Sequence, residues 1–437
     1  MQHEIVWPAW IIAGLLTLLF FWLMLRAGRR LRFLADTPTS KAKGVFIGQV
    51  ELSGRAKLNP SIHSFLAEAD CVWFNYSVEE EWERWETETY TEDGKTKTRQ
   101  VRKSGWTQID RGGEAPAFFI EDETGTVRVQ PEGAEIEAIT VFSETVNRGG
   151  TLYFLKGPAD EISDSNGVRR FTERAILLDA EIFIAGHARE RNDMVAPEIA
   201  ADQTQELFMI SCKGEGRILS GYRWQFWIFG LLMLASLPVA SLIQYNSINE
   251  PSNIPIVATI ALGLIGIWLV GWLWMAFNSL VALRNRTAQG WSLIDVQLKR
   301  RADLIPRLVE VVKGLRNHES NVQTEIAALR TQAVATAPGQ PGPDIAGAKP
   351  LLITIAERYP ELKSSDAFLR LQHELSDTET RIALARDYYN SIATHLNTRL
   401  EIIPDRWFAP LAGLRPQSLL TVESFERASV KINLANS

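Results

Sequence analysis

The sequence predicts a multidomain membrane protein with three transmembrane helices, a β-rich (α+β) domain between the first two, and an antiparallel helical bundle after the third. Three observations predict this architecture. Three long runs are strongly apolar and free of charged residues, as membrane-spanning helices require. Strand-like segments with turn signals lie between the first and second runs. Apolar residues at alternating spacings of three and four follow the third run.

The first apolar run, residues 7–25, predicts an uncleaved transmembrane anchor. Glu4 is the only charged side chain before it, whereas a cluster of basic residues follows it. These are Arg26, Arg29, Arg30 and Arg32. The positive-inside rule therefore places the N-terminus outside and residue 30 in the cytoplasm. A signal peptide carries its positive charge before its apolar core, so we do not interpret this run as one.

The second and third runs, 224–243 and 254–277, predict a transmembrane hairpin. Basic residues come before the second run and after the third, and the turn between them, 244–253, contains none. The turn is therefore expected outside, with both large soluble parts, 34–222 and 278–437, in the cytoplasm. These charge patterns predict a multi-pass protein of a cytoplasmic membrane.

A long charged hairpin is the clearest element of the β-rich domain. Residues 78–92 are rich in acidic side chains, Asp93-Gly94 suits a type I′ turn, and a basic segment begins at Lys95. The expected cross-strand pairs are Glu92 with Lys95, Thr89 with Thr98, and Glu88 with Arg99. We interpret the acidic segment as neutralised by the basic strand; a metal or polycation site is the alternative.

Two shorter elements are predicted in the same domain. Residues 117–129 have two apolar, β-favouring arms around a Gly-containing turn, which predicts a second hairpin. Asn59-Pro60 is typical of a helix start, and the following apolar residues have helical spacing as far as Cys71. These residues are Ile62, Phe65, Leu66 and Ala69.

The segment after the third span predicts two long helices that pack antiparallel. The first continues the span through Trp291 to Leu329, and Pro306 is expected to kink or break it. A Pro/Gly/Ala-rich linker, 333–350, and a short helix, 351–358, follow. The second long helix has its apolar stripe between Phe368 and Leu396. The stripe comprises Phe368, Leu371, Leu375, Thr378, Ile382, Ala385, Tyr389, Ile392 and Leu396.

No catalytic, cofactor-binding or metal-binding constellation is expected. The two cysteines, Cys71 and Cys212, suit a reducing compartment, and the net charge of -6 does not predict a nucleic-acid partner. His373 and Asp377 share a helix face, but no histidine follows a glutamate by three residues, as di-iron bundles require.

Basic residues near the spans are the candidate contact sites. We predict that five arginines contact lipid headgroups: Arg26, Arg29, Arg30, Arg284 and Arg286. Lys299, Arg300 and Arg301 are farther from the third span than a Debye length of about 8 Å, so they are candidate protein contacts instead. Salt bridges within the bundle, such as Lys299 with Asp295, are the favoured alternative.

Four motifs in the β-rich domain resemble a known family. They are Gly48-Gln49-Val50-Glu51-Leu52, Cys71-Val72-Trp73-Phe74-Asn75-Tyr76, Asp122-Glu123-Thr124-Gly125 and Pro131-Glu132-Gly133-Ala134. This pattern resembles the domain between the two membrane spans of GIDE-type proteins, which include a mitochondrial E3 ubiquitin ligase. Such a ligase ends in a zinc-binding RING finger, but no cysteine follows Cys212. We therefore expect neither a RING finger nor ligase activity.

The last third resembles the LemA family of bacterial membrane proteins. The motifs are Phe277-Asn278-Ser279-Leu280-Val281, Trp291 to Pro306, Tyr359-Pro360-Glu361-Leu362-Lys363 and Ala385-Arg386-Asp387-Tyr388-Tyr389-Asn390. The resemblance implies a bacterial inner-membrane protein with a cytoplasmic helical bundle and no established enzymatic activity.

These inferences favour a non-enzymatic membrane scaffold, whose partners are the lipid bilayer, other proteins and a second copy of the chain. The alternative is an accessory subunit whose β domain binds extended substrate segments, by strand addition, for a separate hydrolase or ligase. Transport is disfavoured because the predicted spans hold no charged residue.

Overall fold

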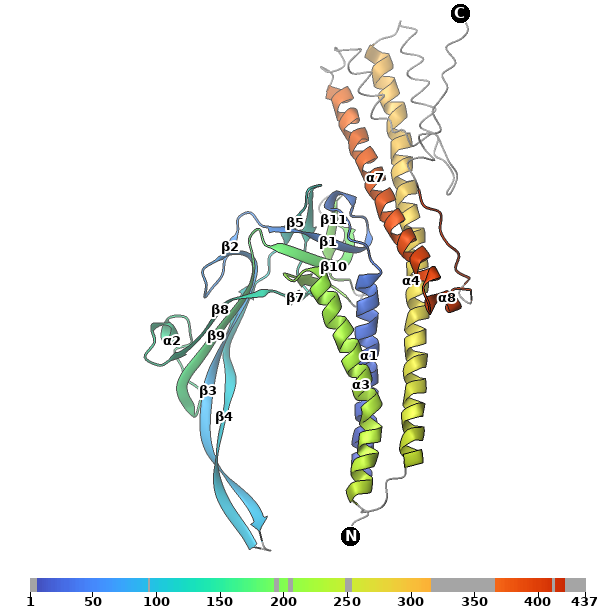
Figure 1. The fold of residues 1–437 in the computed structure, drawn as a ribbon. Coiled ribbons are helices and arrows are strands. Elements are labelled where there is room, and N and C mark those ends of the chain that lie inside the picture. Colours follow the sequence, from blue (N-terminus) through green and yellow to red (C-terminus); the bar gives the residue numbers. More distant parts are fainter. Residues whose placement is uncertain are drawn as a thin grey trace, which may run out of the picture. The chain divides into compact units, whose positions relative to one another are not determined.

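The chain forms two compact units in a computed structural model (Figure 1). The helical unit comprises residues 1–38 and 216–437, and the β unit comprises residues 39–215. Within them the structure describes residues 6–92, 95–191, 196–202, 207–247, 254–315, 366–410 and 413–420.

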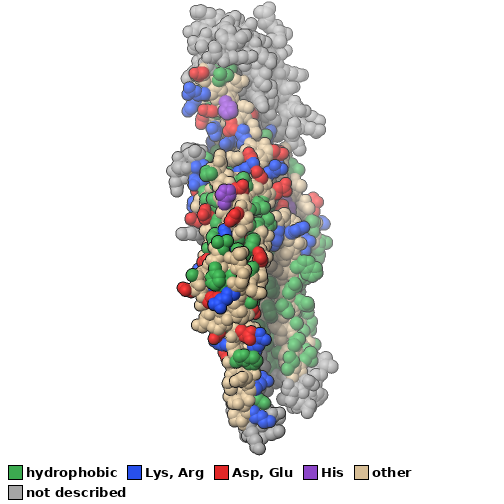
Figure 2. Space-filling model, turned by 90° about the vertical axis from the view of Figure 1, so that its left-hand side faces the viewer, with side chains coloured by type: hydrophobic (Ala, Val, Ile, Leu, Met, Phe, Trp, Pro, Cys, Tyr) green, Lys and Arg blue, Asp and Glu red, His purple; other side chains and the backbone are tan. Residues whose placement is uncertain are grey.

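Three long helices of the helical unit carry apolar stretches long enough to cross a membrane: α1 (Val6–Ala35), α3 (Glu215–Ser247) and α4 (Ile254–Leu315). Many of their large apolar side chains face outward, including Ile11, Leu18, Trp224, Leu231, Leu262 and Val270. Figure 2 shows hydrophobic side chains gathered along these helices. Apolar surface on this scale is typical of segments that contact lipid or a partner.

The three helices pack around a small apolar cluster. Met24 of α1, Phe226 of α3 and Met275 of α4 are its buried members, together with Ala27. Gly28 allows this close packing, because a Cβ there would lie 2.7 Å from the sulfur of Met275. The Thr17 and Ser236 hydroxyls are also hydrogen-bonded at 2.7 Å, which joins α1 to α3.

The third apolar stretch and the first bundle helix are one element, as predicted. α4 is helical through Pro306, so the expected break does not occur there. The second bundle helix, α7 (Asp366–Glu401), buries all of the predicted stripe except Leu371, which is partly exposed. A one-turn helix, α8 (Asp405–Phe408), follows. The predicted linker, 333–350, and short helix, 351–358, lie outside the described residues.

α7 runs antiparallel to α4, as predicted. Leu280 near the middle of α4 packs with Leu396 near the end of α7. Farther along α4, Arg301 lies 3.5 Å from Glu379, which precedes Leu396 on α7. The two helices therefore share a long apolar seam with an ion pair in it.

One sheet of the β unit closes on itself. Its strands, in spatial order, are β1 (Gly48–Lys57), β5 (Phe118–Glu121), β6 (Thr126–Val129), β11 (Pro197–Ala200), β10 (Glu181–Glu190), β12 (Met209–Ser211) and β7 (Glu135–Glu137). Because β1 pairs with both β5 and β10, five of these strands form a barrel-like ring. Buried residues such as Leu52, Phe118 and Ile184 fill it. The predicted 117–129 hairpin is β5–β6.

The second sheet contains the charged hairpin. Its order is β2 (Ile62–His63), β3 (Asp70–Glu92), β9 (Ser165–Leu177) and β8 (Ile139–Asn147), and β4 (Lys95–Glu114) also pairs with β3. The register is the predicted one, with Glu92, Thr89 and Glu88 opposite Lys95, Thr98 and Arg99. The Asp93-Gly94 turn lies outside the described residues. Two short helical turns complete the unit, η1 (Ala42–Gly44) and α2 (Thr151–Leu155).

The prediction of a helix after Asn59-Pro60 is wrong. This segment forms β2 and a tight turn instead, and Ile62 pairs with Cys71. The carboxylate of Glu173 accepts the backbone N–H groups of Phe65, Leu66 and Ala67 at 2.8, 3.0 and 2.8 Å. This long-range acceptor outcompetes the local helical spacing. The ends of the predicted 34–222 range are helical as well, because α1 continues through Ala35 and α3 begins at Glu215.

Candidate functional site

A buried polar junction joins α1, α4 and α7 at Asp36. This residue directly follows α1 and is 6% exposed. Its carboxylate accepts hydrogen bonds from the Ser279 hydroxyl and from Arg399 at 2.8 Å, and His395 Nε2 lies 3.0 Å away. Burial alone would raise the pKa of Asp36, but His395, Arg399 and Ser279 together hold it below its ordinary value. Asp36 is therefore a carboxylate at neutral pH.

Arg399 links this junction to the end of the bundle. Its guanidinium is paired with Asp405 at the start of α8 and also donates to the Ser279 hydroxyl at 3.2 Å. Burial lowers the pKa of Arg399, but Asp36 and Asp405 more than offset that effect and raise it. One guanidinium thus ties the last turn of α7 to α1, α4 and α8.

A cavity of about 320 Å³ lies beside the junction, between α1 and α4. The two helices run parallel here, because Met24 packs with Met275 and, farther along α4, Arg286 donates to the hydroxyl of Thr37, two residues after the end of α1. The lining residues are Leu25, Arg29, Arg32, Phe33, Asp36, Trp274, Met275, Asn278, Ser279, Ala282 and Arg286. The cavity combines apolar and cationic walls.

Arg286 is buried rather than exposed at the surface. It donates to Thr37, and its guanidinium lies 4.9 Å from the centre of the Phe33 ring. Packing of α4 against α1 covers Arg286, so this arginine lines an internal cavity, and its contact with a lipid headgroup stays a prediction. Arg26, Arg29 and Arg284 are exposed, whereas Arg30 is half-buried and donates to the Tyr222 hydroxyl at 3.2 Å.

The three consecutive basic residues on α4, Lys299, Arg300 and Arg301, also differ in exposure. Lys299 is exposed and forms the predicted ion pair with Asp295, at 2.8 Å. Arg300 is exposed, but Arg301 is only 2% exposed and is 3.5 Å from Glu379 in the α4–α7 seam. Arg301 is therefore not a surface contact, because α7 covers it.

Two asparagines on α7 hold an extended segment, residues 413–420. Asn390 donates to the carbonyl of Leu420 and accepts its N–H, both at 2.8 Å. Asn397 does the same with Gln417, at 2.9 and 2.8 Å. The two side chains are seven residues apart, so they lie on one helix face. Each asparagine side chain therefore pairs with the backbone of the segment as a neighbouring β-strand would. We call Asn390 and Asn397 the asparagine clip.

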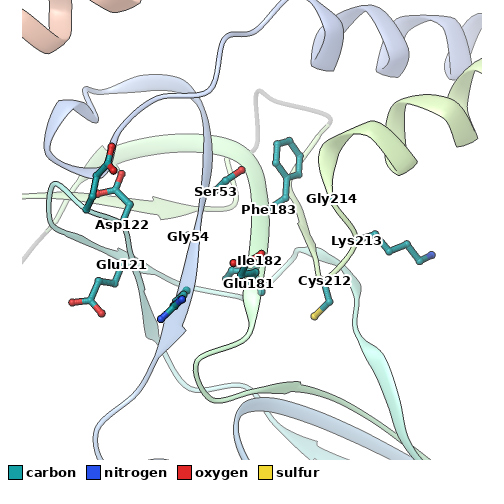
Figure 3. Close-up of a pocket in the computed structure, with 12 residues that line it drawn as sticks. Ser53, Gly54, Glu121, Asp122, Glu181, Ile182, Phe183, Cys212, Lys213 and Gly214 are labelled. Carbon is teal, nitrogen blue, oxygen red and sulfur yellow. The ribbon is translucent and has the colours of Figure 1, made fainter.

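The β unit has a larger, open pocket of about 580 Å³ (Figure 3). Figure 3 shows Glu121 and Asp122 on one side and Cys212 and Lys213 on the other, with their side chains pointing away from each other. Burial raises the pKa of the Cys212 thiol, which disfavours the nucleophilic thiolate. This arrangement does not bring a nucleophile and a base together.

A fully buried ion pair supports the second sheet. Arg169 donates to Glu80 at 3.1 and 3.2 Å and to the carbonyls of Tyr153, Pro158 and Asp160. Burial, followed by hydrogen bonding to Glu80 and Glu161, raises the pKa of the Tyr153 hydroxyl to about 12. Because Arg169 is saturated by these acceptors, we interpret the cluster as a clamp on the 153–161 loop.

Asp377, which shares a helix face with His373, is held by an arginine of its own helix. The Asp377 carboxylate accepts a hydrogen bond from Arg381 at 2.8 Å. Across the described part of the chain, no group of three or more histidine, cysteine or carboxylate side chains is placed to hold a metal ion.

Two families match different parts of the chain. Residues 290–434 match the LemA family, and residues 86–243 match the GIDE family, described as an E3 ubiquitin ligase. The chain combines a LemA region with a GIDE-type region. Both predicted resemblances are thereby confirmed. The junction joins Arg399 of the LemA region to Asp36 and Ser279, which precede that region, whereas the asparagine clip joins two parts of the LemA region itself.

Curated relatives align with about a third of the chain. Protein LemA from Metamycoplasma hominis is 26% identical over 158 residues, which cover 35% of this chain and 72% of that protein. Magnetosome proteins MamQ 1 and MamQ 2 from Paramagnetospirillum magneticum are each 24% identical over 173 residues, covering 32% of this chain and 63% of each relative. The chain thus spans less than two thirds of the MamQ proteins. These relatives show that part of the chain is similar to LemA and MamQ proteins.

The junction and the asparagine clip were not predicted from the sequence. Asp36 and Ser279 are 243 residues apart, and Ser279 and Arg399 are 120 apart, so no local motif joins them. The one available signal was the pair of asparagines at a seven-residue spacing, Asn390 and Asn397, next to the buried stripe.

Proposed function

We propose that this chain is a non-enzymatic scaffold of a bacterial cytoplasmic membrane, with the GIDE-type and LemA regions facing the cytoplasm. The observation that carries the proposal is the continuity of α4, which runs without interruption from its apolar stretch into the bundle. The Asp36–Arg399 pair then fastens α7 to the end of α1. A bundle joined to its spans in this way is suited to hold a partner at a fixed distance from the membrane.

The orientation rests on charge. Arg26, Arg29 and Arg284 are exposed near the same end of the apolar stretches, on the side where the bundle begins. By the positive-inside rule this end faces the cytoplasm. The names of the LemA and MamQ relatives state no substrate.

The docking surface we favour is the α4 patch, defined as Val296, Lys299 and Arg300. Val296 is 54% exposed, and Arg300 lies one turn farther along the same face. An apolar residue beside two exposed cations fits an acidic, partly apolar protein surface. α7 does not cover this face, in contrast to that of Arg301.

In-cell crosslinking followed by affinity capture tests the proposal. The full chain is compared with a Lys299→Glu, Arg300→Glu variant and with Arg284→Glu, an exposed control on the same helix. We expect a defined set of proteins that the double variant loses and the control retains. Equal capture by all three chains would contradict docking at the α4 patch, and capture by none would contradict the scaffold itself.

One observation favours the accessory-subunit alternative. Among the described strands, β8 pairs only with β9, so its other edge is a candidate for strand addition, and Ile139 at its start is 42% exposed. A Thr145→Pro substitution in β8 removes one backbone donor. If the alternative holds, that variant loses substrates while the Lys299→Glu, Arg300→Glu variant keeps them.

A further inference from the structure

The cavity between α1 and α4 changes in polarity along the helix axes. Leu25, Trp274 and Met275 line the end that lies toward the apolar stretches. Arg29 is one helical turn beyond Leu25, and Arg32 is about 10 Å beyond it at 1.5 Å per residue. The apolar end and the cationic end thus succeed one another in the same order as the tail and headgroup of a lipid.

The cationic end keeps a positive charge in excess. Three arginines and one carboxylate, Asp36, line the cavity. That carboxylate already accepts hydrogen bonds from Arg399 of α7 and from Ser279 of α4. No described residue is hydrogen-bonded to the guanidinium of Arg32, although this side chain is half-buried. The lining thus carries three guanidinium groups and one carboxylate.

We propose that this cavity binds one anionic phospholipid, with the phosphate held by Arg29 and Arg32 and the acyl chains along Leu25, Trp274 and Met275. Guanidinium groups recognise phosphate oxygens bidentately. Basic pockets between transmembrane helices are also typical sites for acidic headgroups. The proposal rests on the membrane placement proposed above and is independent of docking at the α4 patch.

The dimensions favour a lipid over free phosphate. A volume of 320 Å³ is at the small end of ligand pockets, about 300–1,000 Å³, and gives room for a glycerophosphate headgroup. Trp274 is 63% exposed at the apolar end, so acyl chains can leave the cavity along it. A free phosphate would leave this apolar wall uncovered.

Lipid binding would also affect the polar junction at Asp36. Asp36 and Ser279 line the cavity and at the same time bind Arg399 of α7. A headgroup seated on Arg29 and Arg32 therefore lies beside the residues that fasten the LemA region to α1. Bound lipid should stabilise that attachment.

Lipid retention by the full chain tests the proposal. The chain is placed in nanodiscs of phosphatidylcholine with a minority of phosphatidylglycerol, and bound lipid is measured by native mass spectrometry. We expect one retained phosphatidylglycerol, and an affinity at least about tenfold weaker for Arg29→Gln, Arg32→Gln, because charged hydrogen bonds are lost. The control is Arg26→Gln, Arg284→Gln, which removes two exposed arginines outside the cavity and should change affinity less than about twofold.

A second variant separates the cavity from surface attraction. Ala282→Trp fills the cavity without changing charge and should also abolish retention. Retention by Ala282→Trp, or equal loss in the Arg26→Gln, Arg284→Gln control, would overturn the proposal. A competition with inorganic phosphate distinguishes the two sources of the phosphate group. If inorganic phosphate displaces phosphatidylglycerol at millimolar concentration, the ligand is free phosphate and not a lipid. Protein capture in cells is scored separately, so each proposal fails on its own readout.

Discussion

Arg399 on α7 donates a hydrogen bond of 2.8 Å to Asp36, which lies 363 residues earlier at the end of α1. Both side chains are largely buried, and Arg399 is held on its other side by Asp405. The first apolar helix of the chain is thus bound to the LemA region by charge as well as by packing. Removing one partner of such a pair leaves the other as a buried, uncompensated charge.

The substitution Asp36→Asn should therefore be strongly destabilising. It preserves the shape of the side chain but removes the negative charge that faces Arg399, which is expected to cost about 3 kcal/mol in free energy of unfolding. Thermal unfolding of the full chain in detergent, followed by tryptophan fluorescence, measures the effect. Asp387→Asn, an exposed site on α7, is the matched control and should leave Tm unchanged. Equal shifts in both variants would contradict the role of the pair.

The pair also predicts a pH dependence. Because the pKa of Asp36 is below its ordinary value of 3.8 in the folded chain, its contribution is complete above that value. It is lost as the pH falls from about 4 toward the folded pKa. The Tm difference between wild type and Asp36→Asn should be constant above about pH 5 and shrink below about pH 4. A difference that already shrinks between about pH 7 and 5 would show that another group governs the junction.

The asparagine clip should control the segment that follows α8. Replacing Asn390 and Asn397 by Ala removes four hydrogen bonds to residues 417 and 420, at a cost of about 3 kcal/mol locally. Hydrogen–deuterium exchange at the Gln417 and Leu420 amides is expected to accelerate at least about tenfold. Thr398→Ala, whose hydroxyl donates to its own helix, serves as the control. Unchanged exchange in the double variant would mean that packing alone holds the segment.

The two cysteines should be unreactive in the native chain. Burial and the nearby carboxylates of Glu173 and Glu114 raise the pKa of Cys71 to about 11, and its thiol donates to the Ile62 carbonyl at 3.6 Å. At neutral pH this leaves roughly a hundredfold less thiolate than a free cysteine has. Iodoacetamide labelling, read by mass spectrometry, should modify Cys212 slowly and Cys71 more slowly still. Rapid native labelling of Cys71 would contradict the described packing of β3.

The local elements of this fold could be predicted because their signals are local and periodic. The pairing of Glu88 with Arg99 follows from folding the chain about one turn, and the α7 stripe repeats at helical spacing. Charge pattern alone did not reveal which face of a helix would be covered. Arg286 and Arg301 were expected at the surface, but α1 covers Arg286 and α7 covers Arg301.

The missed features all depend on long-range partners. Phe65, Leu66 and Ala67 had helical spacing, but their N–H groups bind Glu173, more than 100 residues away. Asp36 is one acidic residue after a basic cluster, and its role depends on Ser279 and Arg399. A single sequence contains no local signal for such contacts.

Photo-crosslinking from position 300 in living cells is the most direct test of docking on α4. A photoreactive residue replaces Arg300 in the full chain, and position 284 carries it in the control. A scaffold that docks its partner on the α4 patch predicts discrete crosslinked proteins from position 300 that position 284 does not give. The same products from both positions, or none from position 300, would contradict that claim.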